Sequence, residues 1–430
     1  MTASSVAPTA ASTESAAPSA TYEQIAERER KYLLQTYSRY PVVLTRGKGV
    51  FLYDIEGRKY LDFVSGLGVN ALGHAHPRIV RAIREQAARL VHVSNLYYHE
   101  YQGPLAEKLC TLASGSSGDG SSREKFRAFF SNSGTEAIEG SIKLARLAGH
   151  RAGGEAKCRL VALEGSYHGR TFGALSLTGQ DKHRKGFEPL LEDVTFVRQN
   201  DVEGLRAAVN DNTCAIVLEP IFGEGGIYEC SPEFLQECRA LADRHKAALI
   251  FDEIQCGLGR TGTIFAFQSF GVMPDIVAIA KPIAAGLPLG AFIAKEEFAN
   301  AIAPGQHGTT FGGGPLACRI ALEFLSIVEE EKLLENVNKV GAYLQQELKA
   351  LAEKRGAGNE VRGRGFIQGI QLEIPARPIV DAGLAEGVLF NSTQDTVVRF
   401  LPPFLLEEKH VDKGIRVLKK LLGKKQKAAA

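Results

Sequence analysis

The sequence predicts an α/β fold: a large domain with a mostly parallel sheet between helices, joined to a smaller α+β domain. The first observation is that short apolar runs alternate with helical segments between about residues 100 and 310. These runs lie at 127–130, 159–163, 214–218, 248–251 and 275–280. The second observation is that they carry little or no charge, which is typical of strands buried on both faces of a parallel sheet. The length of 430 residues also favours more than one domain.

The N-terminal part is predicted to form a tail and one segment of the small domain. Residues 1–21 are nearly all Ala, Ser, Thr and Pro, with Glu14 as the one charge, so we expect a disordered tail. Residues 22–75 should contribute to the small domain. In that segment we expect a helix over 22–37 and, where apolar residues alternate around a Glu-Gly turn, a hairpin over 49–62.

The large domain is predicted to span residues 76–314. A helix should run from about 77 to 91, because a proline is favoured in the first turn of a helix. Further helices are expected at 135–148, 203–209 and 232–245, and a flexible surface loop at 114–122.

The C-terminal region, residues 315–430, should complete the small domain. Its predicted elements are helices over 315–330, 333–354 and 410–422, an extended segment over 361–372, and a strand over 397–400.

Composition excludes several classes of function. Lys and Arg total 51 against 49 Asp and Glu, without the basic excess of a nucleic-acid-binding protein. No run of 18 uncharged apolar residues occurs, so a membrane span is not expected. The seven cysteines form no C-x-x-C pair, which favours a reducing compartment, and we expect a cytoplasmic protein.

An anion site is predicted where the first of the apolar runs meets a helix. Residues 129–137 (FFSNSGTEA) read as a strand, a Ser/Gly/Thr turn and a helix N-terminus, whose N–H groups and dipole attract phosphate. A helix cap centred on Thr135 is the alternative, but it explains the segment imperfectly because Ile138 stands where a capping box needs Glu.

Two charged residues follow buried strands further along the chain. Asp252 stands at the carboxyl end of the run at 248–251, where α/β sheets bind ligands, although a structural ion pair would also explain it. Lys281 follows the run at 275–280, and the next 13 residues carry no charge. Desolvation would lower the pKa of this lysine and make its amine a nucleophile for a carbonyl.

A phosphate cradle, an acid and a nucleophilic lysine are together what pyridoxal 5'-phosphate requires. At these residues the chain resembles the fold-type I pyridoxal-phosphate enzymes, and within them the class III aminotransferases, from about residue 40 to 421. That fold has a seven-stranded, mostly parallel sheet. The segments that carry the resemblance are 131–137 (SNSGTEA), 167–171 (YHGRT), 219–226 (EPIFGEGG), 251–255 (FDEIQ), 280–282 (AKP) and 307–313 (HGTTFGG).

The resemblance implies a role for each cofactor-binding residue. Lys281 would bind the cofactor covalently and move the proton, and Asp252 would keep the ring nitrogen protonated. Gln255 would contact the phenolic oxygen, and Tyr167 would stack on the ring, although a core aromatic is the alternative. The phosphate would be held by Ser133, Gly134 and Thr135, and by Thr310 of a neighbouring subunit, which implies a homodimer with shared sites.

The resemblance also assigns two arginines to substrate carboxylates, which a guanidinium binds with two parallel hydrogen bonds. Arg170 would bind the α-carboxylate of the amine substrate and Arg399 that of glutamate. Glu224 would pair with Arg399 in one half-reaction and release it in the other. A surface salt bridge is the alternative for either arginine.

Within this family, the resemblance is closest to the acetylornithine aminotransferases of arginine biosynthesis. The alternatives are ornithine, succinylornithine, succinyl-diaminopimelate or 4-aminobutyrate as the amine, a glutamate-1-semialdehyde aminomutase, or an inactive cofactor-binding protein. Three residues depart from common family patterns: Phe222, Gly314 and Leu67. Phe222 and Gly314 leave the preferred acyl group open, whereas Leu67 argues mildly against free ornithine.

Two other features are not expected to carry function. His74 and His76 invite a metal site, but no further ligands cluster with them and we expect no metal. The glycine runs near 312 and 363 lack the spacing and the strand-to-helix setting of a dinucleotide site.

Overall fold

The computed structural model describes residues 20–115, 124–354 and 359–423. Nearly all of the tail predicted for 1–21 and of the loop predicted for 114–122 lies outside these residues. Over the described ranges, no helix is both long enough and apolar enough to cross a membrane.

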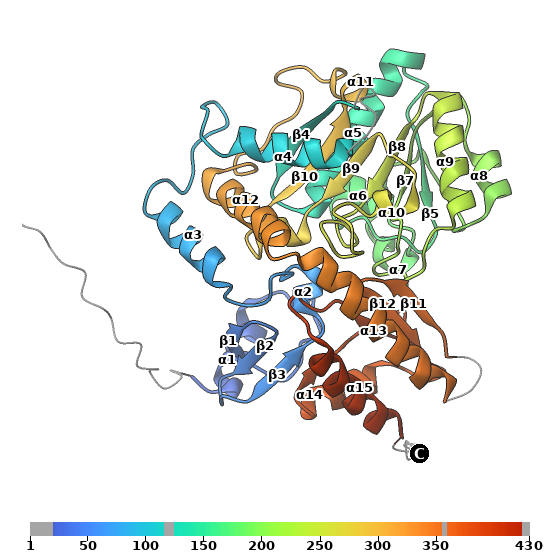
Figure 1. Cartoon of the computed structure of the whole chain (residues 1–430). Coiled ribbons are helices and arrows are strands. Elements are labelled where there is room, and N and C mark those ends of the chain that lie inside the picture. Colours follow the sequence, from blue (N-terminus) through green and yellow to red (C-terminus); the bar gives the residue numbers. More distant parts are fainter. Residues whose placement is uncertain (1–19, 116–123, 355–358, 424–430) are drawn as a thin grey trace, which may run out of the picture.

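A seven-stranded sheet forms the centre of the larger part of the molecule, shown at the top of Figure 1. Its order is β4-β10-β9-β8-β7-β5-β6. All neighbouring strands are parallel except β10, which is antiparallel to both β4 and β9. The strands are β4 (Phe126–Ser131), β5 (Arg159–Leu163), β6 (Val194–Val197), β7 (Thr213–Leu218), β8 (Ala248–Asp252), β9 (Ile276–Ile279) and β10 (Gly290–Lys295).

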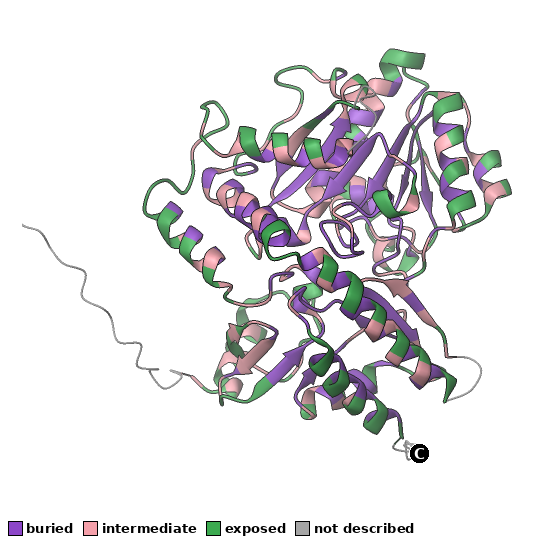
Figure 2. Ribbon diagram, in the orientation of Figure 1, coloured by how far each residue is buried: buried purple, intermediate pink, exposed green. Residues whose placement is uncertain are grey.

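Helices cover both faces of this sheet. Helix α5 (Gly134–Gly153) packs on one face, and α4 (Gln102–Ser114) and α9 (Pro232–His245) pack on the other. Alternate residues of a strand enter opposite cores: Leu249 and Phe251 of β8 join one hydrophobic cluster, whereas Ala248 and Ile250 join the other. This two-sided burial, purple in Figure 2, is the physical reason for the uncharged runs in the sequence.

Two smaller sheets form the lower part of Figure 1. One has the order β1-β2-β3-β13 and the other β11-β12-β15-β14. The C-terminal strand β13 pairs with β3 in parallel, so both ends of the chain build one sheet. The strands are β1 (Leu44–Lys48), β2 (Phe51–Asp54), β3 (Lys59–Asp62), β11 (Val361–Arg364), β12 (Ile367–Gln371), β13 (Val388–Leu389), β14 (Asn391–Thr393) and β15 (Val397–Phe400). The division into domains at residues 75 and 314 stays a prediction.

The remaining helices connect or flank these sheets. They are α1 (Tyr22–Tyr32), α2 (Ser65–Gly68), α3 (Pro77–Ala87), α6 (Phe172–Ser176), α7 (Asp181–Arg184), α8 (Val202–Ala208), α10 (Phe267–Phe270), the 3₁₀-helix η1 (Lys281–Ala284), α11 (Glu296–Ala299), α12 (Pro315–Glu330), α13 (Leu333–Glu353), α14 (Arg377–Ala385) and α15 (Glu408–Gly423).

The predicted helices and strands agree with the structure apart from several ends and omissions. Helix α1 ends at Tyr32 and not at 37, because Leu33 is already extended. Helix α3 ends at Ala87, before the predicted residue 91. Among the elements that were not predicted are the strands β1, β6, β10, β13 and β14 and the helices α4 and α14.

Candidate active site

A cavity of about 430 Å³ lies at the carboxyl ends of the parallel strands β7, β8 and β9. Glu219 follows β7, Asp252 ends β8 and Lys281 follows β9, so the topology brings three residues from distant parts of the chain together. The cavity is lined by nine of the predicted site residues: Ser133, Gly134, Thr135, Tyr167, Arg170, Glu224, Asp252, Gln255 and Lys281.

The N-terminus of α5 lines this cavity. Its N-cap is Ser133, whose Oγ accepts from the N–H of Glu136 at 3.3 Å. The Glu136 carboxylate in turn accepts from the Asn132 N–H at 2.6 Å. The cap centred on Thr135 was therefore the wrong reading, since Ser133 and Glu136 have the Ser-x-x-Glu spacing of a capping box. The Thr135 hydroxyl instead bonds the Thr171 hydroxyl at 2.8 Å.

The Asp252 carboxylate is buried, and both of its oxygens have partners. One lies 2.8 Å from His168 Nδ1, and the other accepts from the Ile254 N–H at 3.0 Å. His168, the partner of this buried carboxylate, was not predicted from the sequence. The feature of the sequence that could have identified His168 is its position next to Tyr167 in the YHGRT segment. The histidine is itself buried, so it holds the carboxylate in one orientation at the cavity wall.

Lys281 is the first residue of η1, half-buried at the cavity wall. Burial lowers the pKa of its amine, and the charge of Glu224 partly opposes this effect. A lysine with a lowered pKa has a larger neutral, nucleophilic fraction at neutral pH. The amine is therefore suited to attack a carbonyl carbon.

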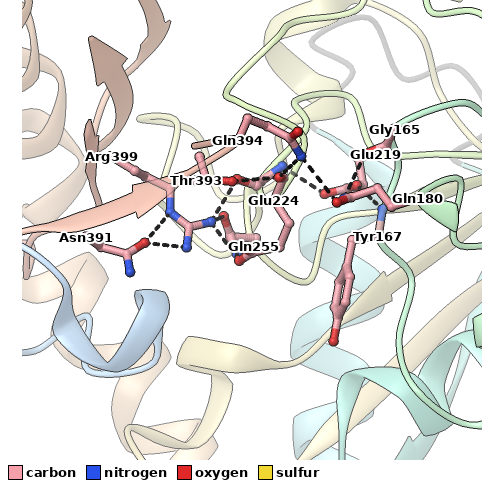
Figure 3. A network of polar contacts seen from close by, with 11 residues as sticks. Gly165, Tyr167, Gln180, Glu219, Glu224, Gln255, Asn391, Thr393, Gln394 and Arg399 are labelled. Carbon is pink, nitrogen blue, oxygen red and sulfur yellow. Dashed lines mark hydrogen bonds and ion pairs between the residues drawn. The ribbon is translucent and has the colours of Figure 1, made fainter. Parts of the chain in front are cut away.

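Glu219 is a second buried carboxylate that the sequence analysis did not select. One oxygen accepts from the Tyr167 N–H and the other from the Gly223 N–H, both at 2.9 Å. Burial, together with the charge of Asp252, raises the pKa of Glu219 to about 7. Its signal in the sequence was its place directly after a buried strand, which it shares with Lys281. Glu219 thus ties the loop that carries Tyr167 to the loop that carries Glu224 (Figure 3).

Glu224 and Arg399 form an ion pair beside the cavity. Arg399 Nη1 lies 2.7 Å from Glu224 Oε1 and 3.1 Å from Gln255 Oε1. Burial alone would raise the pKa of Glu224, but the charges of Arg399 and Lys281 bring it down to about 2. Glu224 is therefore ionised at neutral pH, and the structure places it beside Arg399, as expected from the sequence.

The two other predicted contact residues are exposed. Arg170 donates to the Tyr167 hydroxyl at 3.3 Å and approaches His183 Nδ1 at 3.1 Å, and it lines the open side of the cavity. Thr310 lies outside the lining of the cavity in its own chain. Of the unusual residues, Phe222 is buried in the core, and Gly314 is the N-cap of α12.

This fold and this cavity define a fold-type I transferase dependent on pyridoxal phosphate. The sequence model of "Aminotransferase class-III" matches residues 32–422, and the chain belongs to the class III aminotransferases. One relative, "Acetylornithine aminotransferase" of Methanocaldococcus jannaschii, is 46% identical over 91% of this chain and 96% of its own length. A second relative of that name, from Aquifex aeolicus, is 44% identical over 91% of this chain and 100% of its own length.

Solved structures of the same family superpose on this chain. The ornithine aminotransferase of Toxoplasma gondii has a TM-score of 0.87 at 30% identity, covering 94% of this chain and 95% of its own. The acetylornithine aminotransferase of Elizabethkingia anophelis has a TM-score of 0.80 at 31% identity, with 93% and 98% covered. These similarities support the predicted α/β fold with a seven-stranded sheet, and the cofactor of the family is pyridoxal phosphate.

Proposed function

We propose that this aminotransferase moves the δ-amino group of N2-acetyl-L-ornithine to 2-oxoglutarate, forming N-acetylglutamate 5-semialdehyde and glutamate in arginine biosynthesis. The observation that carries this proposal is the Glu224–Arg399 pair, 2.7 Å apart at the edge of the cavity. When the arginine is paired with the glutamate, the pair presents no net charge to an acylated side chain. When the arginine is unpaired, it can bind a second carboxylate. The relatives named acetylornithine aminotransferase support this choice of amine.

The residues of the cavity fit pyridoxal phosphate. The N-terminus of α5, with Ser133, Gly134 and Thr135, would hold the phosphate through backbone N–H groups and hydroxyls. Asp252 would face the ring nitrogen with a carboxylate that His168 orients. When bound, the cofactor supplies an aldehyde and an electron-accepting ring, which store the amino group between two half-reactions.

Lys281 is the residue that would bind the cofactor covalently through its amine and then carry a proton to and from the substrate carbon. Its lowered pKa makes proton transfer near neutral pH favourable. Tyr167 would stack against the ring, and its position is fixed because Glu219 accepts from its backbone N–H. Gln255, bonded to Arg399, would contact the phenolic oxygen.

Two arginines would divide the carboxylates between the two substrates. Arg170, on the open side of the cavity, would bind the α-carboxylate of acetylornithine. Arg399 would bind the α-carboxylate of glutamate or 2-oxoglutarate after the Glu224 side chain moves aside. The two half-reactions therefore use the same cavity and differ in which arginine is engaged.

We also propose a homodimer with shared sites. Thr310 is exposed next to Phe311, and Leu96, Tyr97 and Tyr98 are exposed on a second loop. Asn95 joins the two loops, since its Nδ2 donates to the carbonyls of Thr309 and Gly312. An apolar surface of this kind suits a subunit interface, from which Thr310 would reach the partner's phosphate. The free cysteines favour a location in the cytoplasm.

The test is to mix the purified holoenzyme with N-acetylornithine and then with 2-oxoglutarate while following the absorption band of the cofactor. We expect the amine to bleach the band and the oxo acid to restore it. Free ornithine, succinylornithine, succinyl-diaminopimelate and 4-aminobutyrate serve as comparison amines. If one of them is faster than N-acetylornithine, the substrate is wrong and the family stands.

Substitution of the cofactor lysine tests the catalytic assignment. Turnover of Lys281→Ala should fall by roughly 10³-fold or more, because both the covalent attachment and the proton carrier are lost. Lys349→Ala, at an exposed position of α13, is the matched control and should keep full activity. Activity of Lys281→Ala near that of wild type would contradict the assignment.

A further inference from the structure

We propose that strand β14 and the following residue, Gln394, position both members of the Glu224–Arg399 pair, and that Asn391 determines how tightly the site binds a dicarboxylate. The proposal deepens the proposed function, on which it rests. The contacts come from one short segment, because Asn391 binds Arg399 while Thr393 and Gln394 bind the main chain of Glu224.

Asn391 binds one edge of the Arg399 guanidinium. Its Oδ1 accepts from Nε at 3.0 Å and from Nη2 at 2.6 Å. The contact follows from the sheet, since Asn391 and Arg399 are opposite each other in the antiparallel pair β14–β15. Occupation of the Nε–Nη2 edge leaves the Nη1–Nη2 end of the guanidinium for a carboxylate.

Among the described residues that bond to Arg399, Glu224 is the one that carries a charge. The other acceptors are the Gly223 carbonyl at 2.7 Å and the amide oxygens of Gln255 and Asn391. Arg399 is only 1% exposed. When the Glu224 side chain moves aside, neutral acceptors keep the guanidinium in place and leave its positive charge to the incoming carboxylate.

Thr393 and Gln394 hold the backbone of Glu224. Its carbonyl accepts from Thr393 Oγ1 at 2.6 Å and from Gln394 Nε2 at 2.8 Å. Gln394 also donates to Gln180 Oε1 at 3.2 Å, which connects this segment to the large sheet's side of the cavity (Figure 3). With its carbonyl fixed, Glu224 can release Arg399 by rotation of its side chain alone.

The alternation of side chains in a strand explains how one segment contacts both residues. Asn391 and Thr393 lie two positions apart and therefore point to the same face of β14. Ser392, between them, points to the other face. Substitution of Ser392 is thus a control on the same strand that leaves the ion pair untouched.

The experiment compares Asn391→Asp with Asn391→Ala. Asp keeps an oxygen in the same place but adds a permanent negative charge beside Arg399, whereas Ala removes the acceptor without adding charge. We measure the dissociation constant of glutarate, a dicarboxylate without the oxo group, for each holoenzyme, and the rates of the two half-reactions.

We expect glutarate affinity to decrease in the order wild type, Asn391→Ala, Asn391→Asp, with the Asp variant roughly tenfold to a hundredfold weaker than wild type. The 2-oxoglutarate half-reaction should slow in parallel, the half-reaction with N-acetylornithine should change less than threefold, and Ser392→Ala should match wild type. The proposal is overturned if Asn391→Asp binds glutarate as well as Asn391→Ala or wild type does, or if both half-reactions slow equally.

The glutarate measurement separates this proposal from the proposed function. If wild-type enzyme does not react with N-acetylornithine, the proposed amine is wrong, and the order of glutarate affinities still decides the role of Asn391. If Asn391→Asp does not fold, Asn391→Ala still tests the proposal. A folded Asn391→Ala protein that binds glutarate as tightly as wild type would overturn the role of Asn391.

Discussion

Arg260 and Arg399 are the two largest side chains that the structure buries completely, and they are bound in opposite ways. Arg260 donates to the backbone carbonyls of Gly68, Phe366 and Pro402, and its guanidinium lies 4.7 Å from the centre of the Phe404 ring. Arg399 instead contacts the side chains of Glu224, Gln255 and Asn391 together with one carbonyl.

The difference shows how burial of the same residue serves two purposes. Backbone carbonyls cannot leave Arg260 without a change in the fold, so it joins three distant segments of the chain permanently. In the proposed function, the Glu224 side chain leaves Arg399 by rotation, and a substrate carboxylate replaces it. Burial alone therefore does not identify a functional arginine, whereas an exchangeable carboxylate partner does.

The strongest test of this contrast is to replace each arginine by methionine. Arg399→Met should lower kcat/KM for 2-oxoglutarate by roughly a hundredfold or more, because two charge-assisted hydrogen bonds are lost. Arg260→Met should instead lower the free energy of unfolding by about 3 kcal/mol, since three buried carbonyls lose their donor.

Steady-state kinetics and chemical denaturation of both variants decide the outcome. Arg399→Met should lose less stability than Arg260→Met, because the Glu224 side chain is 29% exposed at the cavity and water can solvate it. A large stability loss in Arg399→Met with unchanged kinetics would reverse the assignments.

A third arginine extends the comparison to an exposed position. Arg170→Ala should slow the acylornithine half-reaction by about tenfold and the glutamate half-reaction much less, since an exposed guanidinium forms weaker contacts than a buried one. Single-turnover measurements of each half-reaction test this, with Arg198→Ala, an exposed arginine outside the cavity, as control. Equal losses in both half-reactions would show that the two arginines are assigned to the wrong carboxylates.

The smallest expected effect concerns two carboxylates five residues apart. Backbone N–H groups hold Glu219, whose pKa is raised to about 7 from its ordinary 4.5. The native state therefore keeps the Glu219 proton up to a higher pH than the unfolded chain does. The contribution of Glu219 to the free energy of unfolding decreases as the pH rises from 4.5 to 7. Glu224, with a pKa lowered to about 2, has the opposite sign: its share is present above 4.5 and lost as the pH falls towards 2.

Chemical denaturation of the holoenzyme across this range checks the first sign. In Glu219→Gln, the decrease of stability between pH 4.5 and 7 should be smaller than in wild type. Buried Glu253, whose pKa is raised to about 8, should keep part of the decrease in both proteins. An unchanged pH profile in Glu219→Gln would show that Glu219 does not titrate in this range.

Local pattern predicted most of the large sheet, and the exceptions have a physical reason. Strands such as β7 and β8 are buried at every position because both faces are covered, and their nearly unbroken apolar runs are visible in the sequence. Strand β10 was not anticipated, since it follows a Gly/Pro-rich loop and its antiparallel place between β4 and β9 depends on partners far away in the chain.

Within the site, residues at strand ends were predictable and their supporting contacts were not. Lys281 and Asp252 stand out because a charge directly after an apolar run is costly unless it is used. Glu219 also follows a buried strand and could have been selected by the same rule, although its contacts could not be foreseen. His168 and Asn391 act through contacts that the fold creates, such as the pairing of Asn391 with Arg399, which no spacing in the sequence reveals. Their side chains resemble many others until the fold brings them to the cavity.

The pairing of β4 with β10 has a consequence for synthesis of the protein on the ribosome. Ser131, two residues before the proposed phosphate-binding residue Ser133, pairs with Gly290, where even a methyl side chain would lie 2.3 Å from the Ser133 carbonyl oxygen. A nascent chain cannot close this contact until residue 290 has left the exit tunnel, and Arg399 emerges later still. Lys281 and Asp252 therefore leave the ribosome well before Arg399, the residue proposed to bind a dicarboxylate.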